Sequence, residues 1–182
     1  MKKVLIVVDM LNDFCHKDGV LAISPVTNDV YAKTAIDTVK TKVEEYRSNN
    51  DIIIWLADSH AKDDKEFDRF PPHAIKDTWG AQVIDELRPD EIEKSTFEML
   101  IPKTRYSGFY GTDLEYQLMR INPELVEVVG VCTSICVMDT VGGLANRDYN
   151  INVYKDGVAD FDPAGHEVAL GRMEGLYGAK IV

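Results

Sequence analysis

The sequence predicts a doubly wound α/β fold, a three-layer α/β/α sandwich with a mainly parallel, six-stranded sheet. Short apolar runs with the length of buried strands recur along the chain, and the segments between them are long enough to hold helices. This alternation is typical of parallel strands joined by crossover helices. The 182 residues, 45% of them hydrophobic, contain no linker or shift in composition, so we expect one domain over residues 1–182.

The individual elements follow from the spacing of the apolar residues. Apolar runs predict strands at 4–8, 52–56, 126–131 and 151–154, and weaker segments near 91–94 and at 180–182 would bring the sheet to six strands. Apolar residues at helical spacing predict helices over 30–46, 81–87, 113–121, 138–147 and 163–176. For the first helix, Thr27 or Asn28 is a suitable cap and residues 48–50 are a suitable stop.

The balance of charge and the cysteine content exclude several classes of protein. A formal net charge of −11 argues against nucleic-acid and anionic-membrane partners, because both depend on clustered Lys and Arg. The apolar stretch at 4–8 is too short for a signal peptide or a membrane span. The 3 cysteines form neither a disulfide framework nor a Cys-x-x-Cys metal pattern, which suits free thiols in a reducing compartment. We therefore expect a cytoplasmic protein.

Three chemically active side chains come shortly after predicted strands, namely Asp9, Asp58 and Cys136. Because ligands bind beyond the carboxyl ends of the strands in doubly wound sheets, we expect these side chains to converge at one edge. Cys136 lies near the N-terminus of a predicted helix, where the helix dipole lowers a thiol pKa and favours the nucleophilic thiolate. The alternative is that Cys136 is a small buried hydrophobic residue, as most cysteines are.

The segment after the second predicted strand has the composition of a metal site. In an extended segment, Asp58 and His60 point the same way, because side-chain direction has a period of two. His73, which follows two prolines, could supply a third ligand. Carboxylate and imidazole ligands suit Zn²⁺, Mn²⁺ or Fe²⁺. The alternative is a solvated acidic loop in which the histidines have no ligand role.

Three stretches of the chain together resemble the isochorismatase-like cysteine hydrolases, and within that family the nicotinamidases. The stretches are LIVVDMLNDF at 5–14, KTRYSGFYGTDL at 103–114 and GVCTSICV at 130–137, in family order over nearly the whole chain. The resemblance implies a catalytic triad of Asp9, Lys103 and Cys136. Many relatives carry Thr-Asp-x-Cys before the nucleophile, whereas this chain has Ser134 in place of the Asp, and Ser134 can still cap the following helix.

The residue types of this triad suit the hydrolysis of an amide. Asp9 can take the proton of the Cys136 thiol, and the positive charge of Lys103 would lower the pKa of that thiol. The resemblance also implies an oxyanion hole formed by the backbone N–H groups of Cys132 and Cys136. It further implies a cis peptide bond between Val131 and Cys132 in the same loop.

The resemblance extends to a metal site and to a pocket for an aromatic ring. It implies that the metal ligands are Asp58, His60 and His73. Our candidate for the fourth ligand is Glu66, and the alternatives are Asp63, Asp64 and Asp68. The positions that line the ring pocket match Phe14 and Tyr106, with Trp79 as a further candidate.

The function implied by the resemblance is the metal-dependent deamidation of nicotinamide to nicotinate and ammonia, through a thioester on Cys136. The metal, Zn²⁺ first and Mn²⁺ or Fe²⁺ next, would bind the pyridine nitrogen and position the carboxamide. Relatives commonly form dimers or tetramers, so we expect a homo-oligomer. Two alternatives stay open: a hydrolase of the same fold acting on another small amide or on a vinyl ether, and a non-catalytic member of the fold.

Overall fold

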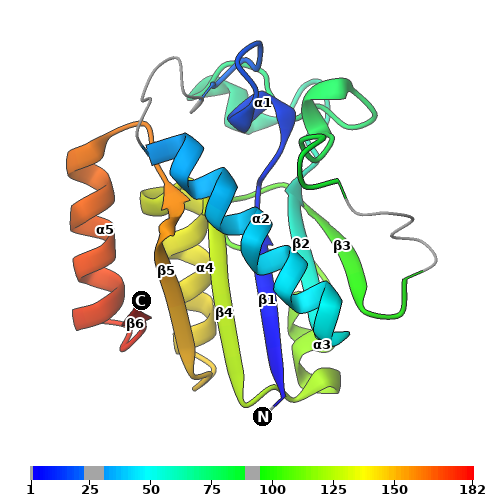
Figure 1. Cartoon of the computed structure of the whole chain (residues 1–182). Helices are drawn as coiled ribbons and strands as arrows, with labels where there is room; N and C mark the ends of the chain where they lie inside the picture. The colour runs from blue at the N-terminus through cyan, green and yellow to red at the C-terminus, as the bar shows by residue number, and fades with distance from the viewer. Residues whose placement is uncertain (1, 23–30, 89–94) are drawn as a thin grey trace.

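The computed structural model describes residues 2–22, 31–88 and 95–182, and it shows a six-stranded sheet between helical layers (Figure 1). All five neighbouring strand pairs are parallel, in the order β3-β2-β1-β4-β5-β6. The predicted fold class is therefore confirmed. The strands are β1 (Lys3–Val8), β2 (Ile52–Asp58), β3 (Glu98–Lys103), β4 (Leu125–Val131), β5 (Ile151–Ala159) and β6 (Lys180–Ile181).

Helices cover both faces of the sheet because successive strand residues point to opposite sides. In β1, Leu5 and Val7 pack in the cluster that contains the buried stripe of α2, while Val4 and Ile6 pack with α3, α4 and α5 (Figure 1). The helices are α1 (Asn12–Cys15), α2 (Tyr31–Asn49), α3 (Leu114–Ile121), α4 (Met138–Ala145) and α5 (Pro163–Gly175). No helix in the described part of the chain is long and apolar enough to cross a membrane.

One predicted helix is absent from the structure, and one predicted strand lies outside the described residues. The expected helix over 81–87 is wrong: Val83 forms an antiparallel bridge with Leu11, and the N–H of Ile84 donates to the carbonyl of Met10 at 3.1 Å. The side chains of Val83, Ile84 and Leu87 are buried in the same cluster as α2, although the segment that carries them is not helical. The weak strand predicted near 91–94 lies outside the described residues, and the third strand is β3.

Glu127 is the one charged residue in the apolar strand β4, and both of its carboxylate oxygens accept a hydrogen bond. Glu127 accepts hydrogen bonds from the hydroxyl of Tyr46 in α2 at 2.7 Å and from the hydroxyl of Tyr154 in β5 at 2.6 Å. Burial of the Tyr46 hydroxyl and its bond to Glu127 raise the pKa of Tyr46. Because both carboxylate oxygens accept a hydrogen bond, Glu127 links α2 and β5 to β4 without leaving a buried polar atom unsatisfied.

Candidate active site

The carboxyl ends of the four adjacent strands β3, β2, β1 and β4 deliver the candidate residues to one edge of the sheet (Figure 1). Asp9 directly follows β1, while Asp58 and Lys103 are the last residues of β2 and β3. Cys136 lies in a π-helical turn, η3 (Thr133–Val137), which follows β4 and continues into α4. The chain reverses its strand order between β1 and β4, and this switch point is where doubly wound sheets bind ligands.

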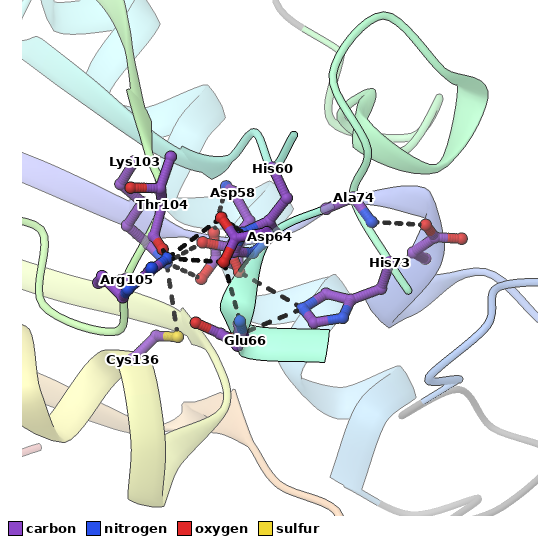
Figure 2. A network of polar contacts seen from close by, with 12 residues as sticks. Asp58, His60, Asp64, Glu66, His73, Ala74, Lys103, Thr104, Arg105 and Cys136 are labelled. Atoms are coloured by element: carbon purple, nitrogen blue, oxygen red, sulfur yellow. Dashed lines mark hydrogen bonds and ion pairs between the residues drawn. The ribbon is translucent and has the colours of Figure 1, made fainter. Parts of the chain in front are cut away.

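The side chain of Lys103 lies at the centre of this group (Figure 2). Its Nζ is 2.7 Å from Asp9 Oδ2, 2.6 Å from Asp58 Oδ1 and 3.5 Å from Cys136 Sγ. Lys103 is only 1% exposed, so its charge is balanced by these carboxylates rather than by water. Asp9 is fixed in turn, because its Oδ1 accepts the N–H of Asp58 at 2.9 Å. The structure thus brings together all three members of the expected triad.

Burial and the local charges set the proton affinities of these groups. Burial and the neighbouring charge of Asp58 raise the pKa of Asp9 to about 7, although Lys103 and a hydrogen bond with Cys136 oppose the shift. Burial disfavours the ammonium form of Lys103, but the charges of Asp58 and Asp9 outweigh it and raise the pKa of Lys103. A carboxyl group that titrates near neutral pH is suited to accept and return a proton.

The pKa of the Cys136 thiol is shifted in the opposite direction from the one we expected. We expected the helix N-terminus and Lys103 to lower its pKa, but burial raises the pKa of Cys136 well above its usual value, against the opposing effect of Lys103. Full desolvation disfavours the thiolate more strongly than one adjacent cation, itself shared with two carboxylates, favours it. The resting thiol is therefore neutral and needs a proton acceptor before it can attack.

Two side chains, one just after β5 and one from α5, hold the turn that carries Cys136. The peptide bond between Val131 and Cys132 is cis, as the resemblance implies. Asp160, which follows β5, accepts the N–H of Ser134 at 2.6 Å, and Thr133 Oγ1 lies 2.8 Å from Nδ1 of His166 in α5. Asp160 thus accepts a backbone N–H of this turn, whereas the Ser134 side chain, which we expected to cap the following helix, is not the cap of either the turn or α4.

A group of metal-ligating atoms lies beside the triad. One ligand atom each from Asp58, His60 and His73 lies within 4.8 Å of the others, and all three residues are buried. The histidines are oriented for binding: Nδ1 of His73 is 2.7 Å from the carbonyl of Pro71, and Nδ1 of His60 is 3.2 Å from Asp64 Oδ2. With the Nδ1 protons donated to these acceptors, each Nε2 presents a lone pair toward Asp58.

The donor set fits a divalent metal ion. Nε2 of His60 is buried without a hydrogen-bond partner, and it lies 3.6 Å from Asp58 Oδ2. Oε2 of Glu66 is likewise buried and unpartnered, while Oε1 of Glu66 lies 3.9 Å from Nε2 of His73. Buried polar atoms without partners are rare, and a cation bound by Asp58, His60 and His73 would satisfy Nε2 of His60, with Glu66 beside that group. Two imidazoles with one or two carboxylates are typical zinc ligands.

The alternatives for the fourth ligand lie elsewhere. Asp63 and Asp68 are exposed, and the carboxylate of Asp64 contacts the far nitrogen of His60 rather than the ligand face. A second acidic group, formed by Asp9, Asp58 and Cys136, also has the spacing of a metal site. The ammonium of Lys103 already contacts all three members of that group, so a metal ion would face direct repulsion there.

A pocket with about 260 Å³ of empty space, part of it open to solvent, lies between the thiol and the metal-ligating group. Buried side chains narrow the pocket on several sides, so it suits a small ligand. Trp79 is absent from its lining: the side chain is 46% exposed, and its ring packs against His16 at 5.0 Å. The lining residues are Phe14, Leu21, Asp58, Glu66, Phe70, His73, Tyr106, Cys132, Ile135, Cys136 and Phe161.

Several residues of the site had no assigned role in the sequence. Phe70, Ile135 and Phe161 line the cavity from loops and turns, where periodicity gives no signal. Asp13 holds the segment after His73, because its Oδ2 accepts the N–H of Ala74 at 2.8 Å. The only available signal for Asp13 was its place within the family-like stretch at 5–14.

Curated relatives match the chain over nearly its full length. An uncharacterized isochorismatase family protein of Bacillus subtilis is 36% identical over 188 residues, covering 100% of this chain and 99% of the relative. A probable inactive nicotinamidase of Arabidopsis thaliana is 28% identical, covering 94% of this chain and 88% of the relative. A ureidoacrylate amidohydrolase of Klebsiella pneumoniae is 28% identical, covering 96% of this chain and 80% of the relative.

Solved structures agree with this relationship. A nicotinamidase/pyrazinamidase of Bacillus subtilis has a TM-score of 0.92 and 34% identity, with 100% of both chains covered. An N-carbamoylsarcosine amidase of Thermoplasma acidophilum has a TM-score of 0.83 and 33% identity, covering 100% of this chain and 95% of the other. A pyrazinamidase of Pyrococcus horikoshii in complex with zinc has a TM-score of 0.85 and 28% identity, covering 100% and 99%. The isochorismatase domain profile matches residues 3–182, and the chain therefore belongs to the isochorismatase family.

Proposed function

We propose that this protein is a metal-dependent cysteine amidohydrolase that converts nicotinamide and water to nicotinate and ammonia. The observation that carries the proposal is that a buried thiol and a metal-ligating group line the same small cavity, together with aromatic rings from Phe14, Phe70 and Tyr106. A planar aromatic amide can pack against these rings while its two ends meet the metal-ligating group and the thiol. The nicotinamidase and pyrazinamidase relatives support the same assignment.

The reaction proceeds in two steps through a thioester on Cys136. Asp9 takes the proton of the neutral thiol, the sulfur attacks the carboxamide carbon, and the returned proton leaves with ammonia. Water, activated by Asp9, then hydrolyses the thioester to nicotinate. Lys103 stabilises the negative charge that passes between Asp9 and the sulfur, which it contacts at 2.7 and 3.5 Å. Backbone N–H groups of Cys132 and Cys136 would stabilise the oxyanion.

The metal site serves to position the substrate. Asp58, His60 and His73, with Glu66 as the fourth candidate, would hold a divalent ion, most readily Zn²⁺. The chemistry that such an ion supplies is coordination of a heteroaromatic nitrogen, which orients the ring. Orientation of this kind lowers the barrier because the carboxamide reaches the thiol already aligned.

The charge of the cavity favours a neutral substrate. Among the described residues that line it, none is Lys or Arg, so no side chain of the lining offers a positive charge to a substrate carboxylate. Ureidoacrylate and N-carbamoylsarcosine, after which two of the relatives are named, are anions at neutral pH. A single observation favours a hydrolase of such an anionic amide as the second candidate: the Arg69 guanidinium lies 5.9 Å from the ring of Tyr106, which lines the cavity.

The cellular setting forms part of the proposal. Cys15, Cys132 and Cys136 are free thiols, which suits the reducing conditions of the cytoplasm. A homo-oligomer stays a prediction, made from the resemblance to relatives that commonly form dimers or tetramers.

Removal of the metal is expected to abolish ammonia release from nicotinamide, and addition of Zn²⁺ is expected to restore it. The measurement compares purified protein before chelation, after chelation and after reloading, with metal content determined in each sample. Benzamide is the matched substrate, because it keeps the carboxamide and lacks the ring nitrogen, and it should be hydrolysed slowly in every sample. Full activity in a sample shown to be metal-free would refute the role of the metal, and no ammonia in any sample would refute the nicotinamidase assignment.

A further inference from the structure

The carboxylate of Asp64 makes three contacts that converge on the metal-ligating group (Figure 2). Oδ2 of Asp64 lies 3.2 Å from Nδ1 of His60, and Oδ1 accepts the N–H of Glu66 at 2.9 Å. Nη1 of Arg105 lies 2.9 and 3.2 Å from the two oxygens. The Asp64 side chain is 8% exposed, so these are contacts of a largely buried carboxylate rather than of a solvated surface.

The contact with His60 fixes the form of the imidazole. A neutral imidazole can present only one lone pair, and a hydrogen bond donated from Nδ1 leaves that lone pair on Nε2. Nε2 of His60 is the buried, unpartnered atom that faces Asp58. Asp64 therefore selects the tautomer in which His60 can bind a cation.

The contact with the N–H of Glu66 fixes a second side chain. Asp64 is the N-cap of the short 3-10 helix η1 (Lys65–Asp68), whose buried residue is Glu66. That cap sets where the Glu66 carboxylate enters the site, 3.9 Å from Nε2 of His73. One carboxylate thus orients a histidine and a glutamate that lie on opposite sides of it in the sequence.

The contact with Arg105 ties this loop to the triad. Arg105 follows Lys103, the last residue of β3, by two positions. The ion pair between Arg105 and Asp64 therefore joins the loop that carries the metal-ligating group to the strand that carries the buried lysine. Because Nη1 of Arg105 lies within hydrogen-bond distance of both carboxylate oxygens, the ion pair limits rotation of Asp64 away from His60.

We propose that Asp64 and Arg105 are positioning residues that set the metal affinity of the site, with Asp64 acting through the Nδ1 proton of His60 and not as a metal ligand. The inference rests on the metal site of the proposed function and is independent of the substrate. Loss of such a partner of a metal-binding histidine typically lowers metal affinity by roughly 10–100-fold.

The test measures the dissociation constant for Zn²⁺ by competition with a chromophoric chelator, using metal-free full-length protein. Asp64→Asn is expected to raise this constant by roughly 10–100-fold, and Arg105→Gln by a smaller factor. Asp63→Asn is the matched control, because it removes the same charge from the exposed neighbouring position and should leave the constant within about twofold of the wild type.

Cobalt substitution separates a positioning role from ligation. At saturating Co²⁺, Asp64→Asn should show the visible absorption spectrum of the wild type, because the ligands are unchanged, whereas loss of a ligand would alter it. An altered spectrum, or a zinc constant for Asp64→Asn within twofold of the wild type, would overturn the inference. If Asp64→Asn does not fold, Arg105→Gln decides by the same criteria. Absence of metal binding by the wild-type protein would instead contradict the metal site itself.

Discussion

Replacing Cys136 by alanine is expected to lower the turnover of nicotinamide by roughly 10⁴-fold or more, because the thioester can no longer form. The thiol is buried at 4% exposure and lies against Lys103, so its removal leaves a small cavity without an uncompensated charge. The fold and the metal content should therefore persist. The measurement is the initial rate of ammonia release, with zinc content and the far-ultraviolet circular dichroism spectrum recorded on the same preparation.

Cys132→Ala is the matched control for this variant. Cys132 is also buried beside the cavity, at 2% exposure, and is expected to contribute its backbone N–H group rather than its thiol. We expect this variant to keep activity within about tenfold of the wild type, since the side chain is removed and the backbone remains. Undiminished turnover in Cys136→Ala, or equal losses in both variants, would remove Cys136 from the role of nucleophile.

Replacing Asp9 by asparagine is expected to lower kcat by about 10²–10⁴-fold, the range that general acid–base catalysis contributes. The substitution is nearly isosteric, and the asparagine oxygen can still accept the N–H of Asp58, as Asp9 Oδ1 does at 2.9 Å. What it removes is the group that takes the proton of the buried Cys136 thiol, whose pKa is raised by burial. The measurement is kcat for ammonia release with metal-loaded protein.

Zinc affinity is the control for Asp9→Asn. Asp9 contacts the N–H of Asp58 but lies outside the group of Asp58, His60 and His73, so the dissociation constant for Zn²⁺ should change far less than kcat. A kcat within about threefold of the wild type would show that Asp9 is not the proton acceptor. If zinc affinity fell in parallel with kcat, the effect of Asp9→Asn would instead come from a change in the structure of the metal site.

The central strands and the residues at their ends could be predicted from the sequence, because a strand that is buried on both faces is recognisable as a continuous apolar run. β1, β2 and β4 are buried on both faces, so they appear as apolar runs, and Asp9 and Asp58 lie at or just after strand ends. The edge strand β3 was missed because its pattern is broken by the exposed Leu100 and by Pro102, a residue tolerated only where no ladder hydrogen bond is required. Lys103 was therefore assigned from the family resemblance alone.

The electrostatics of the site could not be predicted in the same way. The sequence placed a cation beside Cys136 but could not show that Lys103 is shared between two carboxylates at 2.7 and 2.6 Å. The effect of burial on a thiol depends on packing from several distant segments, which no local pattern records. For the same reason the sequence did not indicate that Asp64 contacts Nδ1 of His60. Asp64 was only one of four acidic residues considered as the fourth metal ligand.

A competition between three substrates tests whether nicotinamide is the preferred amide of this protein. Metal-loaded protein is given nicotinamide, ureidoacrylate and N-carbamoylsarcosine at equal concentrations in one vessel, and the consumption of each is followed by chromatography. The ratio of the initial rates then equals the ratio of the kcat/KM values. We expect nicotinamide to be consumed first, with nicotinate and ammonia formed in equal amounts. Consumption of either anionic substrate while nicotinamide remains intact would contradict it.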